Sequence, residues 1–98
     1  MTKKKSTNLL SGIRVLDLTR VMSGPFCTSM LADLGAEIIK IEMPDIGDEA
    51  RYFGPFYKGE SAYFMLLNRS KKSVTVNLKT DEGRALIRNI IPKCDVLI

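Results

Sequence analysis

The chain has 98 residues, of which 45% are hydrophobic and 27% are charged, as is typical of one globular domain or part of one. Its formal net charge is +4, but Lys3, Lys4 and Lys5 supply most of that charge. The sequence contains no histidine, which excludes histidine-based zinc sites and Ser-His catalytic triads within this chain, and we expect no metal site.

Residues 1–9 are predicted to form a disordered basic tail. The tail lysines are not interleaved with aromatic residues, and no segment has the 18 or more apolar residues of a membrane span, so we expect neither a nucleic-acid nor a membrane partner. Cys27 and Cys94 are far apart and have apolar neighbours, which favours buried thiols in a reducing compartment. The sequence therefore predicts a cytoplasmic protein.

The first half of the chain predicts a strand, a helix and a second strand. Residues 12–19 (GIRVLDLT) have the aliphatic and β-branched content of a short strand, and residues 36–42 form a second apolar run. Between them, residues 23–34 have the period of a helix. The predicted apolar face of this helix consists of Cys27, Met30, Leu31 and Leu34. A compact βαβ unit with parallel strands follows from this order.

The predicted ends of this first helix rest on small residues and proline. Ser23 or Gly24 can cap the N-terminus, and Pro25 suits the first turn, where its missing N–H costs nothing. Gly35 is expected just past the last helical residue, where glycine often adopts a left-handed conformation.

The middle of the chain predicts a long loop and a short, ambiguous element. Residues 43–60 contain two prolines and three glycines, and loops of this length are often functional. Residues 61–69 (SAYFMLLNR) indicate a short helix, although residues 63–67 could also form a strand. Residues 71–79 (KKSVTVNLK) alternate polar and apolar side chains and predict another strand.

The last part of the chain predicts a helix and a final strand. Thr80 is expected to cap a helix over residues 81–91, which ends at Pro92. Its predicted buried stripe consists of Leu86, Ile87, Ile90 and Ile91. Residues 94–98 (CDVLI) begin another strand, in which the chain stops. The order of elements predicts an α/β fold whose parallel sheet has flanking helices and is incomplete at the C-terminus.

In such sheets, ligands bind beyond the carboxyl ends of the strands. Residues 19–25 form a strand-to-helix turn at this edge, so they are either an anion or carbonyl site or an ordinary capped turn. The turn has neither the G-x-G-x-x-G motif of dinucleotide-binding folds nor a P-loop lysine.

Several acidic residues have both a structural and a functional interpretation. Asp45 and Asp48 could serve metal binding or acid–base chemistry, but acidic residues in a glycine-containing loop are more often solvated turn residues. Asp17 lies in an apolar strand and needs a partner, for which Arg14, Arg20 or backbone donors are the candidates. We expect a structural ion pair there.

Cys27 and three lysines also have both a structural and a functional interpretation. Cys27 lies in the first part of a helix, but without a base in the chain it is expected to be a thiol in the core. Lys71, Lys72 and Lys79 flank a strand and could face phosphates, with solvated lysines at a sheet edge as the more common alternative.

Five ordered stretches resemble the N-terminal region of the family III CoA-transferases: GIRVLDL, SGPFC, LADLGAEIIKIE, GDEAR and KSVTVNLK. The family includes formyl-CoA transferase, carnitine- and succinate-type CoA-transferases and α-methylacyl-CoA racemase. The resemblance covers nearly the whole chain after the lysine tail. It implies a Rossmann-like fold, in which residues 10–98 are the N-terminal part of the CoA-transferase large domain, and an interlocked homodimer for the intact protein.

The resemblance also implies a reaction. Family members pass coenzyme A between carboxylic acids through mixed anhydrides and thioesters of an aspartate nucleophile. That aspartate lies downstream of the matched region, and no aspartate of this chain corresponds to it. The expected partners are coenzyme A thioesters and small carboxylic acids, with coenzyme A as a substrate and no other cofactor.

Two methionines replace polar residues at positions that the resemblance assigns to coenzyme A. Met22 stands where formyl-CoA transferase has a glutamine beside the catalytic aspartate, so a polar role there would fall to backbone N–H groups of the turn, including that of Ser23. Met43 matches an arginine at the nucleotide end of coenzyme A. Its thioether can pack against adenine but carries no charge.

The resemblance places one further stretch along the nucleotide. Val76, Asn77, Leu78 and Lys79 match it, and Lys79 is the lysine that the family has there. A truncated, non-catalytic module that binds coenzyme A and an acyl-CoA racemase of the same family remain alternatives. An unrelated dinucleotide-binding oxidoreductase is disfavoured by the missing glycine motif.

Overall fold

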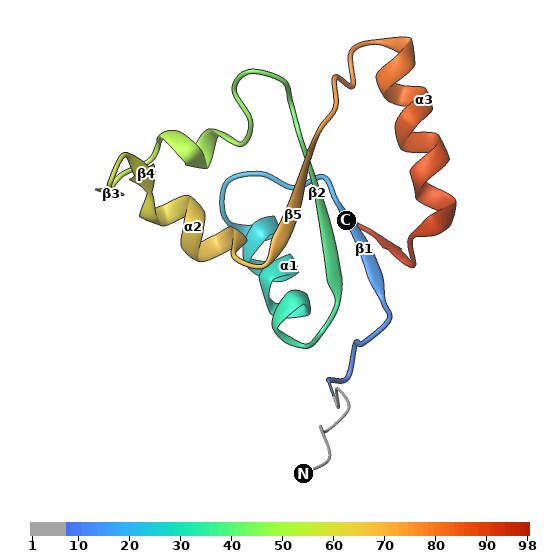
Figure 1. Ribbon diagram of the computed structural model, residues 1–98, viewed down its shortest axis with the longest axis horizontal. Helices are drawn as coiled ribbons and strands as arrows, with labels where there is room; N and C mark the ends of the chain where they lie inside the picture. Colours follow the sequence, from blue (N-terminus) through green and yellow to red (C-terminus); the bar gives the residue numbers. More distant parts are fainter. Residues whose placement is uncertain (1–7) are drawn as a thin grey trace.

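A parallel four-stranded sheet forms the centre of the computed structural model, which describes residues 8–98 (Figure 1). Its strands are β1 (Arg14–Asp17), β2 (Glu37–Glu42), β5 (Lys71–Thr75) and β6 (Val96–Leu97), in the order β5-β2-β1-β6. The predicted α/β fold is confirmed, and this strand order is that of a Rossmann-type half-sheet. The first seven residues of the predicted tail lie outside the described residues.

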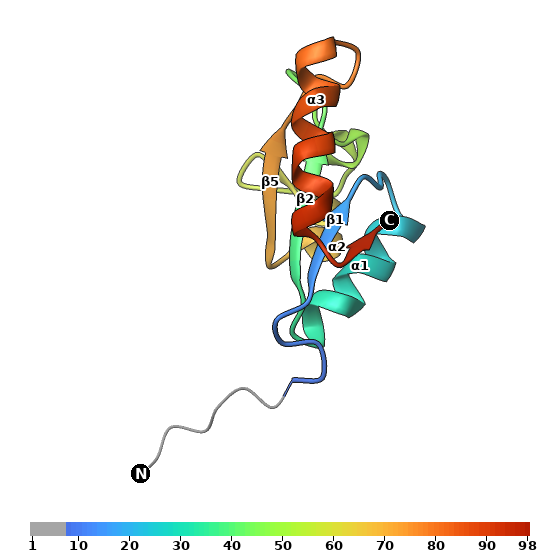
Figure 2. The same ribbon diagram turned by 90° about the vertical axis from the view of Figure 1, so that its right-hand side faces the viewer.

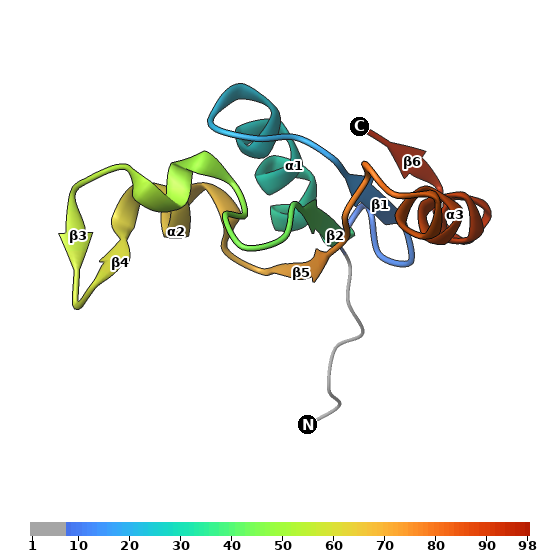
Figure 3. The same ribbon diagram turned by 90° about the horizontal axis from the view of Figure 1, so that it is seen from above.

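Helices cover both faces of the sheet. Helix α1 (Ser23–Asp33) joins β1 to β2 on one face, and α3 (Asp81–Ile90) joins β5 to β6 on the opposite face (Figures 2 and 3). A short 3₁₀ helix, η2 (Ile91–Lys93), follows α3. This placement confirms the predicted βαβ unit and the predicted capping of α3, because the Thr80 hydroxyl accepts from the Gly83 N–H.

The long loop after β2 has structure of its own. It contains a 3₁₀ helix, η1 (Glu49–Tyr52), and a hairpin of β3 (Phe56–Tyr57) and β4 (Glu60–Ser61), which projects away from the sheet (Figure 1). Helix α2 (Ala62–Asn68) follows directly, so the helical interpretation of this segment is confirmed.

The strand predicted over residues 71–79 ends earlier than expected. Strand β5 stops at Thr75, and residues 76–79 form a turn that leads into α3. The reason is the close approach of α3 to this turn: a Cβ atom on Gly83 would clash with the backbone carbonyl of Asn77. The start of α3 therefore holds the turn in place.

The N-terminus of α1 differs from the prediction. Met22 occupies the N-cap position without a side-chain cap, and Ser23 is already helical. Gly24 is needed for a different reason, because a Cβ atom there would clash with the Thr19 side chain. Pro25 lies in the first turn as expected, and Gly35 has the predicted left-handed conformation, with φ of 108°.

Two apolar clusters hold the helices to the sheet. Beneath α3 the buried residues are Leu16, Ile41, Val76 and Ile87. Beneath α1 they are Val15, Ala36 and Ile38. Of the stripe predicted for α3, Ile87 is buried and Ile90 is half-buried, but Leu86 and Ile91 are exposed.

The predicted apolar face of α1 is largely wrong. Cys27, Met30 and Leu34 are exposed, so Cys27 is not a thiol in the core. The residues that α1 buries are Pro25, Thr28 and Ser29. Of the predicted face, Leu31 packs against the sheet. Helical period alone cannot find the rest, because the sheet beneath the start of α1 is polar, with the Thr28 hydroxyl bonded to Asp17, and because the Ser29 hydroxyl donates to the Leu67 carbonyl of α2.

A buried ion pair lies on that polar part of the sheet. The Asp17 carboxylate is 3.2 Å from the Lys71 ammonium group, and the two side chains are 0% and 2% exposed. The Thr28 hydroxyl donates to the same carboxylate at 2.7 Å. The predicted ion pair of Asp17 is confirmed, but its partner comes from β5 and is neither Arg14 nor Arg20. The prediction of a solvated Lys71 is wrong.

Burial and hydrogen bonding act in opposite directions on these two groups. Burial would raise the pKa of Asp17, but hydrogen bonds from Thr19 and Thr28, together with the charge of Lys71, bring this pKa below its ordinary value. Burial lowers the pKa of Lys71, and Asp17 opposes that shift. The two threonines therefore do most to favour the charged form of Asp17, and Asp17 in turn favours the charged form of Lys71.

The neighbouring lysines of β5 offer a direct test of this ion pair. Lys71→Ala should lower the free energy of unfolding by about 3–5 kcal/mol, because it leaves the Asp17 carboxylate buried and unpaired. Lys72→Ala is the matched control, since Lys72 is 70% exposed and pairs at the surface with Glu37; it should cost about 1 kcal/mol or less. Urea unfolding followed by circular dichroism measures both, and equal effects would contradict the structural role of Lys71.

Candidate functional site

A pocket of about 300 Å³ opens at the carboxyl ends of β1, β2 and β5. This volume lies at the lower end of the range for small-molecule sites, and the position is where open α/β sheets bind ligands. The pocket is lined by Leu18, Thr19, Arg20, Ile41, Glu42, Met43, Gly47, Asp48 and residues 76–79.

The pocket brings together five of the seven residues predicted to contact coenzyme A. They come from two separate segments and comprise Met43, Val76, Asn77, Leu78 and Lys79. Met22 and Ser23 do not line it; both are exposed and follow its rim residue Arg20 along the chain. Five of the predicted residues thus line the pocket, and the other two lie in the turn at the start of α1.

The 76–79 turn is fixed by its own hydrogen bonds. The Val76 N–H donates to the Glu42 carbonyl at 2.9 Å, which continues the pairing of β5 with β2 by one residue. The Lys79 N–H donates to the Asn77 side chain at 3.0 Å. Val76 is buried, whereas Asn77 and Lys79 are exposed, so the turn presents polar groups above an apolar base.

Basic groups stand at the mouth of the pocket. Lys79 is exposed and, within residues 8–98, its ammonium group forms no ion pair. Arg20, on the opposite rim, pairs with Glu49 at 3.1 Å in an exposed position. An unpaired lysine beside a half-open pocket can bind an anionic group such as a phosphate.

Both acidic residues that line the pocket are neutralised. Glu42 pairs with Arg51 at 2.7 Å, and its hydrogen bonds to Arg51 lower its pKa from 4.5 to about 2 despite burial. Asp48 pairs with Lys40 at 2.9 Å, and each side chain is 1% exposed. The carboxylates of Glu42 and Asp48 therefore do not cancel the positive charge of Lys79.

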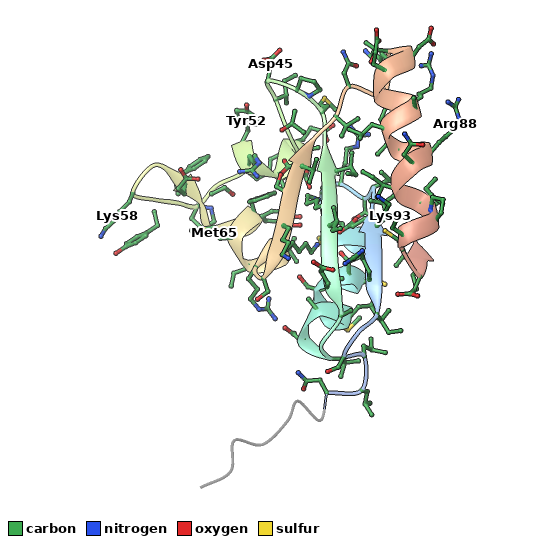
Figure 4. All side chains as sticks on the ribbon, turned by 45° about the vertical axis from the view of Figure 1, so that its right-hand side comes forward. Asp45, Tyr52, Lys58, Met65, Arg88 and Lys93 are labelled. Atoms are coloured by element: carbon green, nitrogen blue, oxygen red, sulfur yellow. The ribbon has the colours of Figure 1, made fainter. Side chains whose placement is uncertain are left out.

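The structure separates the two loop aspartates that the sequence treats alike. Asp45 is exposed at the tip of the loop beyond the strand ends, as predicted (Figure 4). Asp48 is buried, and its carboxylate accepts from the backbone N–H groups of Val21 and Ala50. The prediction of a solvated Asp48 is wrong, because this residue caps η1 and pairs with a lysine from β2.

Sequence reasoning also missed Lys40. This lysine interrupts the apolar run EIIKIE and lies on the same face of β2 as the buried Ile38, two residues earlier. A charged residue at an inward position of a buried strand requires a partner of opposite charge. The alternation of inward and outward residues in β2 was therefore sufficient to predict that Lys40 is buried in an ion pair. The identity of the partner, Asp48, depends on a loop that periodicity does not describe.

Within residues 8–98, no cluster of three or more His, Cys, Asp or Glu residues is arranged to hold a metal ion. None of the helices described here has the length and apolar content that crossing a membrane requires.

Comparison with known proteins gives one consistent result. Residues 10–98 match the model of CoA-transferase family III. The chain is 50% identical over 90 residues to the succinyl-CoA:glutarate CoA-transferase of Mus musculus, covering 91% of this chain and 21% of that protein. It is 45% identical over 96 residues to the acetyl-CoA:oxalate CoA-transferase of Acetobacter aceti, covering 98% of this chain and 25% of that protein.

Solved structures agree with these matches. A CAIB/BAIF family protein from Brucella suis superimposes with a TM-score of 0.85 and 39% sequence identity, over 94% of this chain and 25% of that one. The chain thus spans about a quarter of the length of the curated relatives and structures that it matches.

The pairing of Glu42 with Arg51 predicts a specific acid sensitivity. Because the folded-state pKa of Glu42 is about 2, below its ordinary 4.5, the stability from this carboxylate is present above about pH 4.5 and is lost as the pH falls toward 2. Arg51→Gln should raise the pKa of Glu42, lower stability at neutral pH and flatten the dependence between pH 4.5 and 2. Carbon-13 NMR titration of the carboxyl group and unfolding at each pH measure these effects.

Arg69→Gln is the control, since Arg69 pairs with Asp33 in an exposed position. It should leave the pKa of Glu42 unchanged. A Glu42 carboxyl group that titrates near 4.5 in the unsubstituted protein would contradict the role assigned to Arg51.

Proposed function

Since the chain belongs to CoA-transferase family III, we propose that it forms the CoA-binding part of an acyl-CoA:carboxylate CoA-transferase. The observation that carries this proposal is the pocket at the strand ends, where an unpaired lysine stands beside an apolar base. The names of the relatives describe transfer of coenzyme A between acids such as succinate and glutarate, or acetate and oxalate. Small carboxylic acids are therefore the proposed acceptors.

The nucleotide end of coenzyme A is proposed to occupy the pocket. The Lys79 ammonium group would bind a phosphate, and residues 76–78 would lie along the nucleotide. Met43, on the other wall, is exposed and would pack against the adenine ring. In this proposal Lys79 makes the charged contact with coenzyme A, and Met43 and residues 76–78 contact it through their shape and apolar surface.

The thioester end is proposed to border the turn before α1. Met22 and Ser23 are exposed there, and the Met22 side chain cannot donate a hydrogen bond, so the backbone N–H groups of the turn are the available donors. In the proposed mechanism, an aspartate attacks the thioester carbonyl and displaces coenzyme A as a thiolate, leaving a mixed anhydride.

That nucleophile is proposed to lie outside this chain. Asp17 and Asp48 are buried in ion pairs, and the Asp48 carboxylate is fully occupied by Lys40 and two backbone N–H groups. The remaining aspartates, which are Asp33, Asp45, Asp81 and Asp95, do not line the pocket. This distribution supports a CoA-binding role for the residues present here.

A non-catalytic CoA-binding module is the second candidate, and the same distribution of aspartates favours it. An acyl-CoA racemase of the same family would use the same pocket. Assays of turnover distinguish these possibilities. A transferase moves coenzyme A between two acids, a racemase inverts a 2-methylacyl group, and a binding module does neither.

We also propose a cytoplasmic location and, for the intact protein, an interlocked homodimer.

Removal of the lysine charge tests the nucleotide site. Lys79→Ala should weaken CoA binding about tenfold, which corresponds to one lost charge-assisted hydrogen bond, and added salt should weaken the unsubstituted protein more than the variant. Lys58→Ala is the matched control, because Lys58 is exposed at the distant hairpin (Figure 4). Isothermal titration calorimetry with CoA measures both. An equal loss for both variants, or none for Lys79→Ala, would contradict the site.

An arginine at position 43, where the resemblance expects one, tests whether Met43 contacts the nucleotide end of coenzyme A. Met43→Arg should tighten CoA binding about three- to tenfold, because a guanidinium group at this position can reach the phosphates. The same substitution at Met65, which is exposed on α2, should change the affinity less than twofold. Binding by Met43→Arg that is unchanged or weaker would remove Met43 from the nucleotide end.

A further inference from the structure

The turn between β1 and α1 contains a residue in an unfavourable conformation. Val21 has φ of 72°, in the left-handed region that β-branched residues rarely adopt. Such a conformation persists only where the surrounding structure holds it, and it occurs preferentially at functional sites. Val21 directly precedes Met22, so its conformation sets the direction of the turn that leads into α1.

Asp48 provides the hydrogen bond that holds this residue. The Val21 N–H donates to Asp48 Oδ1 at 3.0 Å, and the same oxygen accepts from the Ala50 N–H at 2.9 Å. The carboxylate is therefore fixed within its own loop and reaches across to a segment 27 residues earlier. Because Asp48 also lines the pocket, one side chain joins the pocket wall to the turn.

Lys40 fixes the other oxygen of the same carboxylate. Its ammonium group lies 2.9 Å from Asp48 Oδ2 and also donates to the Thr19 carbonyl at 2.9 Å. Lys40 belongs to β2, which is paired on both sides, so its position is set by the sheet. A single buried cation thus orients Asp48 and anchors the beginning of the turn.

We propose that Asp48, oriented by Lys40, is a positioning residue that holds Val21 so that the backbone N–H groups following it, from Met22 onward, face the thioester end of a CoA ester. This inference rests on the proposed function, which places the thioester beside that turn. Because Met22 offers no polar side chain, recognition there depends on backbone geometry. Loss of a residue that sets this geometry should then weaken binding of the thioester end without weakening binding of the nucleotide.

Asp48→Asn tests the proposal with two probes and one ligand-free measurement. Asparagine presents an NH₂ group to the buried Lys40, so the turn should loosen and exchange of the Val21 amide hydrogen should accelerate at least tenfold. Affinity for acetyl-CoA should fall about tenfold, whereas affinity for adenosine 3′,5′-bisphosphate, which lacks the thioester arm, should not fall, because the substitution removes a negative charge from the pocket lining. Asp45→Asn, in the same loop but exposed, should change none of the three quantities.

A second variant separates positioning from general damage to the fold. Val21→Gly in the Asp48→Asn background should restore acetyl-CoA affinity to within about threefold of the unsubstituted protein, since glycine adopts positive φ without steric cost. If Asp48→Asn fails to fold, exchange in the unsubstituted protein decides. Its Val21 amide should be protected by the buried carboxylate, and an unprotected amide would overturn the proposal.

Other results would overturn either the positioning role of Asp48 or the proposed function. Equal weakening of both probes by Asp48→Asn, or unchanged exchange and unchanged affinity, would overturn the positioning role. If the unsubstituted protein binds neither probe, the proposed function fails, and Val21 exchange in the two proteins still decides whether Asp48 holds the turn.

Discussion

Two buried ion pairs constrain the sheet face beneath α1. Asp17–Lys71 joins β1 to β5 across β2, and Lys40–Asp48 joins β2 to the loop that follows it. Charges removed from water must be paired and hydrogen-bonded, and no buried polar side-chain atom within residues 8–98 lacks a hydrogen-bond partner. The positions of β5, the 43–52 loop and the turn before α1 therefore depend on one another.

This constraint explains where the candidate site lies. The apolar clusters hold α1 and α3 against the sheet, while the Lys40–Asp48 and Glu42–Arg51 pairs lie where β2 leads into the following loop. Pairing with Lys40 and Arg51 neutralises the two carboxylates that line the pocket, and Arg20 is paired with Glu49, so Lys79 is the lining cation without an ion pair within residues 8–98. The edge proposed to bind coenzyme A therefore keeps one unpaired positive charge.

The sequence predicted the elements better than their contacts. Period and caps located β1, β2, α1, α2 and α3, and the resemblance supplied five of the twelve residues that line the pocket. The buried face of α1 was missed, because Thr28 and Ser29 are buried for their hydroxyl groups and Met30 is exposed although apolar. Asp48 was misread for a related reason: its partner is 8 residues away in sequence but reaches it only through the fold of an irregular loop.

Amide NMR during titration with CoA shows whether coenzyme A binds at the carboxyl ends of the strands. We expect the largest chemical-shift changes on residues 76–79, Met43 and the 19–23 turn, with little change in the β3–β4 hairpin. A second pocket, lined by Gly12, Arg14 and Lys93 among others, lies at the opposite end of the sheet. Changes concentrated there, with residues 76–79 unaffected, would contradict the account.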